Sequence, residues 1–139
     1  MTQYEANFYQ WTQDTASRLR SGEFTRIEVD ALVEEVEDLG KREKSALQSR
    51  AAVLICHLLK WDYQPAKRSK SWEATIQLQR KRIDRLLRQS PSLQPFLCES
   101  LAEAYSEAVL LAVKQTGLDR ETFPESCPYT LDKILWGGL

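Results

Sequence analysis

Apolar residues recur at intervals of three and four along most of this chain, and no segment alternates as a half-buried strand does. This spacing places the apolar side chains on one face of an α-helix. Five amphipathic segments follow one another, with these faces in chain order: Tyr4, Phe8, Trp11, Thr15 and Leu19; Val29, Leu32, Val33 and Val36; Leu47, Ala51, Leu54, Leu58 and Trp61; Trp72, Ile76, Gln79, Ile83 and Leu86; Leu97, Leu101, Ala104, Ala108 and Leu111. We expect all five faces to meet and to exclude water.

Glycines and a capping motif mark several helix ends. Gly22 and Gly117 follow the first and the fifth segment, as glycine commonly follows the last turn of a helix. Thr25 and Glu28 have the spacing of a capping box, which predicts that the second helix begins there. Gly40 predicts a kink or a break before the third helix, because glycine inside a helix costs about 1 kcal/mol.

Prolines and serines set the later boundaries. The third helix is expected over about residues 41–61 and ends before Pro65, since the residue preceding a proline disfavours helical geometry. Ser69 or Ser71 is placed to cap the fourth helix. The pair Ser90-Pro91 combines a cap with a proline in the first turn and predicts the start of the fifth.

The C-terminal part has a different pattern. Two X-Pro steps predict an extended tail over Phe123–Tyr129, and Thr130 is placed to cap a short helix over Leu131–Trp136. Together the segments predict an all-α fold: an antiparallel helical bundle of four to five main helices with an extended, proline-containing C-terminal tail and a short final helix. A length of 139 residues predicts one domain over residues 1–139.

Six short motifs occur in a fixed order. They are FYQWTQ at 8–13, EEVEDLG at 34–40, HLLKWDYQP at 57–65, SKSW at 69–72, SPSL at 90–93, and FP at 123–124 with CPYT at 127–130. In order and spacing the chain resembles the bacterial family named domain of unknown function 29, over essentially its whole length. The resemblance implies a small all-helical bacterial protein and carries over no activity, cofactor or catalytic residue.

The composition is that of an ordinary globular protein, with 42% hydrophobic and 28% charged residues and a net charge of −1. No run approaches the roughly 20 apolar residues of a membrane-spanning helix, and the first residues lack the pattern of a secretory signal. We therefore expect a cytoplasmic protein with no membrane partner. Cys56, Cys98 and Cys127 are odd in number and far apart, which predicts buried thiols without a disulfide framework or a zinc site.

Charge is unevenly distributed along the chain. Residues 60–88 hold nine basic side chains against three acidic ones, and the segments on either side are net negative. On the predicted fourth helix, Lys81, Arg85 and Arg88 form a row opposite the apolar face. The candidate binding residues of this basic face are Lys67, Arg68, Lys70, Lys81, Arg85 and Arg88.

Three interpretations of the basic face remain open. Trp61, Tyr63 and Trp72 are close by in the sequence, and cations beside aromatic rings are what nucleic-acid binding requires. A whole-chain pI near 5.9 counts against that interpretation. The face also suits an acidic protein partner or self-association. The third interpretation is a solvated helix face opposite an acidic row on the next helix, formed by Glu99, Glu103 and Glu107.

A second group of polar residues borders the apolar faces. Glu43 and His57 lie along one edge of the third helix, and Gln79 falls within the apolar face of the fourth. Because a buried amide needs hydrogen-bond partners, we predict a polar network of Glu43, His57 and Gln79 that fixes the register of the two helices. On this hypothesis Gln79→Leu alone costs about 1–3 kcal/mol of stability.

His57 is also the candidate for metal or acid–base chemistry with the carboxylates of the second helix. Those carboxylates are Glu34, Glu35, Glu37 and Asp38. A single histidine cannot form the paired Glu-x-x-His motifs of di-iron bundles, and the carboxylates flank the apolar face or point away from it. Cys56 and His57 are neighbours on a helix, so their side chains diverge by about 100° and cannot pair. We therefore assign no catalytic residue, metal site or cofactor.

Three functions follow from these observations. The first is a non-catalytic protein-interaction module that binds another protein or itself, which the segregated charge and the lack of a reactive group of residues favour. The second is a nucleic-acid-associated protein that uses residues 60–88. The third is a metal-dependent hydrolase that uses His57 and the nearby carboxylates. The balance of the sequence is against an enzyme.

Overall fold

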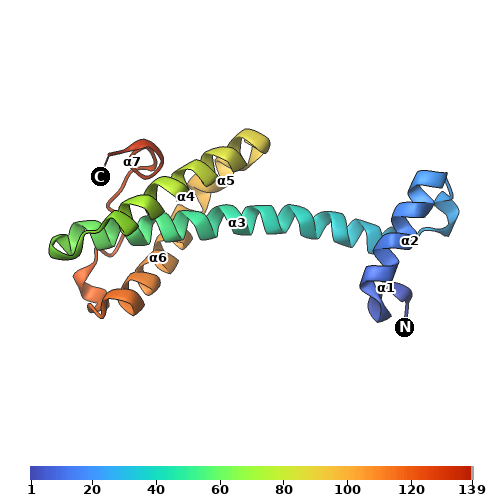
Figure 1. The fold of residues 1–139 in the computed structure, drawn as a ribbon, viewed down its shortest axis with the longest axis horizontal. Helices are drawn as coiled ribbons and strands as arrows, with labels where there is room; N and C mark the ends of the chain where they lie inside the picture. The colour runs from blue at the N-terminus through green and yellow to red at the C-terminus, as the bar shows by residue number, and fades with distance from the viewer. Residues whose placement is uncertain (139) are drawn as a thin grey trace. The chain divides into compact units, whose positions relative to one another are not determined.

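The computed structural model describes residues 1–138, and all regular structure within them is helical. The chain divides into two compact units, Met1–Arg42 and the part that begins at Glu43. The helix α3 (Val29–Tyr63) contributes residues to both, as Figure 1 shows. The prediction of an all-α helical fold is confirmed.

The N-terminal unit contains α1 (Gln3–Ala6), α2 (Phe8–Ser21), the 3₁₀ turn η1 (Phe24–Arg26) and the first turns of α3. Asn7 separates α1 from α2, and its side chain accepts a hydrogen bond from the backbone N–H of Gln10 at 3.3 Å. Gly22 ends α2 with a φ of 79°, a conformation that glycine adopts without steric cost, so the predicted stop is confirmed.

The capping box predicted at Thr25 is wrong. Thr25 lies inside η1, and α3 begins four residues later at Val29. The carbonyl of Glu28 accepts the first helical hydrogen bond, from the N–H of Leu32 at 3.1 Å. A salt bridge between Arg26 and Glu23 at 3.0 Å closes the 3₁₀ turn, and this local pairing replaces the capping box.

The break predicted at Gly40 is also wrong, because α3 is one helix of 35 residues. The cost of a single glycine in a helix, about 1 kcal/mol, is small beside the cooperativity of the turns on either side. Helix propensity gives the local cost of Gly40, and it does not include the cooperativity of the neighbouring turns.

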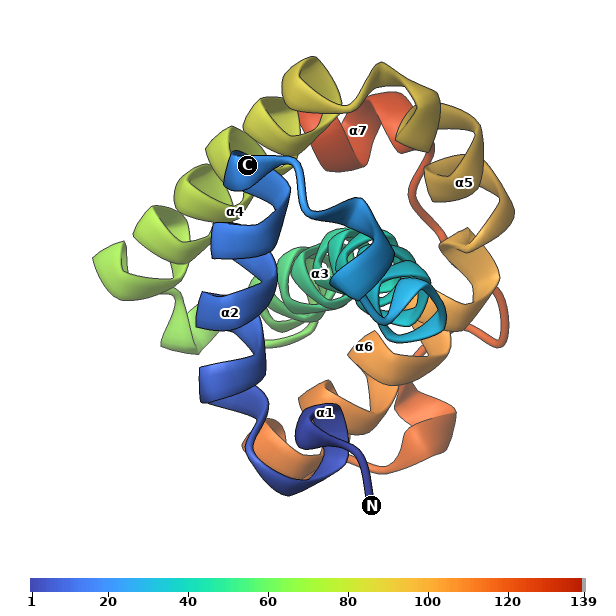
Figure 2. The same ribbon diagram turned by 90° about the vertical axis from the view of Figure 1, so that its right-hand side faces the viewer.

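The C-terminal unit packs four helices around the rest of α3: α4 (Lys70–Gln89), α5 (Gln94–Glu99), α6 (Leu101–Thr116) and α7 (Leu131–Trp136). Figure 2 looks along α3 and shows these helices around it. Short 3₁₀ turns join them, at Pro65–Lys67 (η2), Pro91–Leu93 (η3) and Arg120–Thr122 (η4). The predicted inner positions of α3 form the core: Leu47, Ala51, Leu54 and Leu58 are all buried, together with Ile76 and Ile83 of α4.

Most of the later boundaries agree with the sequence. α3 ends at Tyr63, two residues before Pro65, and Gly117 ends α6 with a φ of 75°. Ser69 caps α4 by accepting from the N–H of Trp72, and Thr130 caps α7 by accepting from the N–H of Lys133, each at 3.2 Å.

The fifth predicted helix is two helices in the structure. α5 ends at Glu99, and the buried Ser100, with a φ of −91° and a ψ of 2°, separates it from α6. Its hydroxyl donates to the carbonyl of Leu97 at 3.4 Å. Ser90 accepts no side-chain capping hydrogen bond, and its hydroxyl donates to Glu43.

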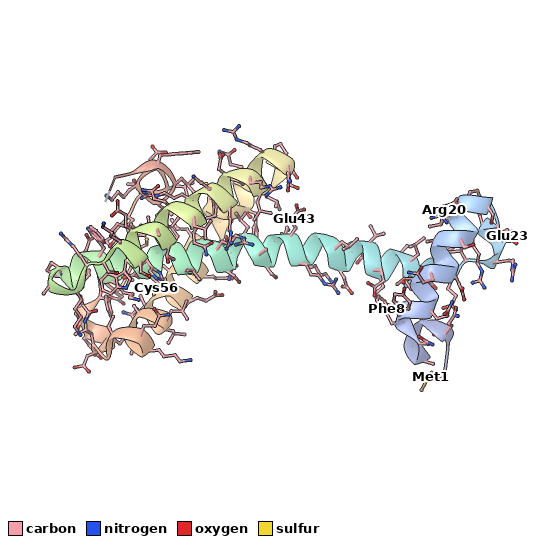
Figure 3. All side chains as sticks on the ribbon, in the orientation of Figure 1. Met1, Phe8, Arg20, Glu23, Glu43 and Cys56 are labelled. Atoms are coloured by element: carbon pink, nitrogen blue, oxygen red, sulfur yellow. The ribbon has the colours of Figure 1, made fainter. Side chains whose placement is uncertain are left out.

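The cysteines are only partly as predicted. All three thiols are free, and Cys56 is buried, next to Gln115 of α6; Figure 3 labels it on α3. Burial raises the pKa of the Cys56 thiol to about 11. Cys127 is half-buried and Cys98 is exposed, so the prediction of three buried thiols is wrong for Cys98. It follows Leu97, which takes the inward position on α5.

Candidate protein-interaction surface

The apolar face predicted for the second helix is largely uncovered, and of its four residues only Leu32 is half-buried. Val29 is 60% exposed, Val33 48% and Val36 60%, and Leu39 at the edge of the same face is 61% exposed. The prediction that this face is buried is therefore wrong. These four residues are called the α3 apolar face below. Val29, Val33 and Val36 have the same i, i+4, i+7 spacing as Leu47, Ala51 and Leu54, which the C-terminal unit buries.

α3 uses a different face to pack within the N-terminal unit. Ala31 is buried and Glu35 is half-buried. The hydroxyl of Tyr4 donates a hydrogen bond to Oε1 of Glu35 at 2.5 Å. That hydrogen bond, more than any other contact, raises the pKa of Tyr4 above its ordinary value. Ala31 and this polar contact mark the side of α3 that faces inward, and the valines lie outside it.

An aromatic cluster is the centre of this small unit. The rings of Tyr4 and Trp11 meet edge to face with centroids 4.7 Å apart, and Phe8, labelled in Figure 3, lies 5.8 Å from each of them. Trp11 and Thr15 are buried as predicted, but neither the indole N–H of Trp11 nor the hydroxyl of Thr15 has a hydrogen-bond partner among residues 1–138. The unit therefore has a thin core with two unsatisfied polar groups.

The N-terminal unit exposes far more apolar surface than its size predicts. Within residues 1–138, nine of the thirteen large hydrophobic residues that are exposed belong to its 42 residues. Besides the α3 apolar face these are Met1, Phe8, Tyr9, Leu19 and Phe24. Only Trp11, Thr15 and Ala31 are buried in it. Contiguous exposed apolar surface on a protein commonly marks a site of interaction.

Charged residues follow one another in a definite order along the N-terminal part of α3. Six carboxylates come first along the chain, and no base lies among them: Glu28, Asp30, Glu34, Glu35, Glu37 and Asp38. Lys41 and Arg42 follow directly. A surface cleft of about 420 Å³ lies beside the first turn of α3, and four of its lining residues are acidic: Glu5, Glu28, Asp30 and Glu34. The charge of this part of α3 is therefore polarised along the helix.

The basic face of the C-terminal unit is on the surface, as predicted. Lys67, Arg68, Lys70, Lys81, Arg85 and Arg88 are all exposed. Two other cations of the same segment, Lys60 and Arg80, are buried. Nε of Arg80 donates to the carbonyl of Ile134 at 2.9 Å, and its Nη2 donates to the carbonyl of Lys133 at 3.0 Å. Burial lowers the pKa of Arg80. Through its two hydrogen bonds to the backbone, Arg80 holds α7 against α4.

A surface cleft of about 330 Å³ lies between α4 and α7. Gln77, Arg80, Lys81 and Asp84 line it from α4, and Trp136 lines it from α7. Arg80 uses two of its donors on the backbone of α7, and Asp84 forms a salt bridge with Arg88 at 2.8 Å. The polar groups of this cleft are therefore largely engaged within the chain.

The aromatic residues beside the basic face are engaged within the chain. The guanidinium of Arg68 stacks 4.9 Å from the ring centroid of Trp61, and its Nε donates to the Trp61 carbonyl at 2.9 Å. Nζ of Lys60 lies 4.8 Å from the ring centroid of Trp72. Tyr63 packs edge to face on Phe123, with centroids 5.3 Å apart. These contacts occupy the rings that the sequence offered as stacking surfaces for bases.

The acidic row on the following helix has other contacts. Glu107 accepts a hydrogen bond from Nε2 of Gln48 at 2.7 Å, and Glu99 and Glu103 are exposed. Within the part of the chain that the structure describes, the salt bridges are Arg26–Glu23 and Arg88–Asp84, both along one stretch of chain. The pairing of the basic face with this row is therefore not formed.

The predicted network of Glu43, His57 and Gln79 does not form. Glu43 accepts from the hydroxyl of Ser90 at 2.9 Å, and Nδ1 of His57 lies 2.9 Å from the carbonyl of Val53 in its own helix. Oε1 of Gln79 is buried with no hydrogen-bond partner among residues 1–138, at a groove of about 250 Å³ formed with Ala46, Ser49, Arg50 and Val53. Glu43 and His57 are too far apart to contact each other, because the 14 helical positions between them span about 21 Å.

His57 is half-buried, and burial lowers the pKa of its imidazole below the ordinary value. The nearby Lys60 lowers it further, whereas the hydrogen bond with Val53 raises it. No group of three or more His, Cys, Asp or Glu side chains in residues 1–138 is arranged to hold a metal ion.

Sequence reasoning missed the exposed apolar surface, although one signal for it was present. The acidic run, followed at once by two bases, has the polarised charge pattern of a helix surface that meets another helix.

The family described as "Domain of unknown function DUF29" matches residues 3–137. No curated protein and no solved structure matches the chain. In residues 1–138, no helix combines the length and the apolar character needed to cross a membrane.

Proposed function

The chain belongs to the family described as domain of unknown function DUF29, and from this premise we propose that it is a non-catalytic protein-interaction module that binds through its N-terminal unit. The family supplies no activity, so the proposal depends on the surface of the chain itself. Binding would bury the α3 apolar face together with the exposed aromatic side chains of the unit.

One observation carries the proposal. A unit of 42 residues buries three side chains and leaves nine large hydrophobic residues exposed. Chains of about 40 residues seldom build a sufficient core without disulfides, metals or a partner surface. A partner that covers Val29, Val33 and Val36 would complete the core on the side where α3 has none.

The other exposed surfaces support binding less well. The basic face has lost its aromatic platforms to contacts within the chain, as described for Trp61 and Trp72. The large hydrophobic residues exposed elsewhere in residues 1–138 are only Tyr63, Leu78, Leu110 and Trp136. The N-terminal unit is therefore the part of the chain whose surface most resembles an uncovered core.

Site-specific photocrosslinking tests the proposal. A photoreactive phenylalanine analogue replaces Val36 in the full chain, and a second version carries it at Leu110 on α6, which is 67% exposed. After irradiation in cells that naturally contain the protein, we expect a discrete adduct from position 36 and none from position 110. Equal labelling at both positions, or no adduct from position 36, would contradict the proposal.

A further inference from the structure

We propose that the cleft between α4 and α7 binds a small phosphate monoester, with the phosphate held by Arg80 and Lys81 and an aromatic ring of the same molecule stacked on Trp136. This inference goes beyond the proposed function, because it concerns the C-terminal unit and a small molecule. Its basis is a buried arginine whose charge has no carboxylate partner, at a cleft that a lysine and an exposed tryptophan also line.

Arg80 is a buried cation without a counter-charge. Its side chain lines the cleft, and the residue is only 8% exposed. Its two hydrogen bonds go to neutral carbonyls, those of Lys133 and Ile134, and they use two of the five N–H donors of a guanidinium. Within residues 1–138 no carboxylate forms a salt bridge with it. Because a charged side chain is seldom buried unless it is paired, an anion in the cleft would supply the partner that the chain does not.

The charges around the cleft favour an anion with more than one negative charge. Lys81 lines the cleft beside Arg80 and is exposed. Nζ of Lys133 donates to the carbonyl of Gly138, another lining residue, at 2.7 Å. The acidic residue of the lining is Asp84, and its carboxylate already forms the salt bridge described above. A phosphate monoester carries a charge of about −1.5 to −2 near pH 7, so it balances these three cations better than a carboxylate does.

Two glycines, Gly137 and Gly138, line the cleft after the end of α7. A Cβ atom added to Gly137 would lie 2.6 Å from the backbone oxygen of Lys133, so the close pass of the chain against α7 requires a glycine. A Cβ atom added to Gly138 would meet nothing within 4 Å. No side chain covers the backbone at these two positions, as is common where a backbone approaches a ligand closely.

Trp136 offers the surface for the ring. It is 65% exposed, while the two residues before it, Ile134 and Leu135, are 1% and 7% exposed and hold α7 in the core. An indole that is left uncovered at the side of a cleft can stack on a planar ring. The cleft of about 330 Å³ lies at the lower end of the range for small-molecule sites, roughly 300–1,000 Å³. Its size therefore fits a small molecule and not only a free ion.

Titration of the full chain with adenosine monophosphate, followed by backbone amide NMR, tests the site. This probe combines a phosphate monoester with an aromatic ring. We expect the amide signals of Gly137 and Gly138 to shift and to saturate with a Kd below about 1 mM, while those of Gly22 and Gly117, which end other helices, stay in place. Inorganic phosphate should bind more weakly at the same two glycines, and adenosine should not bind. The absence of a saturable shift at Gly137 and Gly138 with adenosine monophosphate would overturn the proposal.

A matched pair of variants tests the phosphate contact. Lys81 and Arg85 are both exposed on α4, and only Lys81 lines the cleft. Lys81→Ala should weaken the binding of adenosine monophosphate at least about fivefold, because a charged hydrogen bond to the phosphate is lost. Arg85→Ala should weaken it less than about twofold at physiological salt. Equal losses would show that the ligand responds to the general charge of α4, and they would overturn the site. Circular dichroism shows whether the variants keep their helices.

Trp136→Ala tests the stacking contact. It should weaken the binding of adenosine monophosphate at least about fivefold and leave the binding of inorganic phosphate unchanged, because only the first ligand has a ring. An equal effect on both ligands would mean that the variant disturbs the cleft as a whole, and it would overturn the role of Trp136. Binding of adenosine monophosphate that Trp136→Ala leaves unchanged would do the same.

Discussion

The hydroxyl of Tyr4 and the carboxylate of Glu35 are joined by a hydrogen bond of 2.5 Å across 31 positions of the chain. Tyr4 stands in α1 and Glu35 in the second turn of α3, so the bond holds α3 to the aromatic cluster by a polar side chain. The valines of α3 lie on another face and remain exposed. The side of α3 that carries Glu35 therefore faces the aromatic cluster, and the α3 apolar face is available for binding.

Tyr4→Phe should loosen the N-terminal unit without removing its aromatic ring. Glu35 then loses a donor, and the backbone amides of α2 should exchange with solvent faster, because Tyr4, whose ring packs on Trp11 of α2, is no longer bonded to α3. Hydrogen exchange read by mass spectrometry over residues 8–21 measures this. Tyr9→Phe is the matched control, since the Tyr9 side chain is exposed. Equal exchange in both variants would mean that the Tyr4–Glu35 bond does not order the unit.

Arg80→Met should lower the unfolding free energy by about 2–3 kcal/mol, because two backbone carbonyls of α7 lose a charged donor in a buried place. Methionine keeps most of the apolar length of the side chain, so the loss reports mainly on the hydrogen bonds. Urea unfolding gives the value. Lys81→Met, on the exposed side of the same helix, should stay within about 0.5 kcal/mol of the wild type, and a similar loss in both variants would refute this role of Arg80.

Gln79→Leu should be neutral or should raise the unfolding free energy by up to about 1 kcal/mol, since it removes a buried carbonyl oxygen that has no partner among residues 1–138. The prediction reverses the sign expected from the sequence, where a network was assumed. Urea unfolding again gives the value, with Gln77→Leu at an exposed position of α4 as the control. A loss above about 1 kcal/mol would show that the side chain has a stabilising partner.

His57 should make stability depend on pH in the window from about 6.5 down to the lowered pKa of its folded imidazole. Burial lowers the pKa of the folded imidazole, so the unfolded chain takes up the proton at a higher pH, near 6.5. Stability is therefore fully present above about 6.5 and decreases as the pH falls toward the folded pKa. The drop in urea midpoint across this window should be smaller in His57→Gln than in the wild type. An identical drop would assign the pH dependence to other groups.

The sequence predicted those features of the fold that are decided locally. Gly22, Ser69 and Thr130 act through backbone groups three or four residues away, and all three end or begin helices where expected. The inward face of α3 in the C-terminal unit was also predicted, because the spacing of Leu47 and Leu54 identifies the face and neighbouring helices cover it.

The same spacing led to a wrong prediction for Val29 and Val36, which are exposed instead of buried. Periodicity tells which residues share a face of a helix, but it does not tell whether another element covers that face. The partners of Arg80 were equally hidden, because the two carbonyls it contacts lie more than 50 positions away and belong to the backbone. Contacts of that kind depend on how helices meet, which no local pattern in the chain specifies.

The central claim is that the α3 apolar face is uncovered in a single chain and buried on binding, and side-chain footprinting with hydroxyl radicals tests it most directly. Leu39 and Leu110 are a matched pair, 61% and 67% exposed, and Leu54 is the buried reference. In the purified protein at low concentration we predict that Leu39 is oxidised as readily as Leu110. In an extract of cells that naturally contain the protein, Leu39 should become protected while Leu110 does not. Leu39 as protected as Leu54 in the purified protein would contradict the account, because the face would then already be covered within one chain.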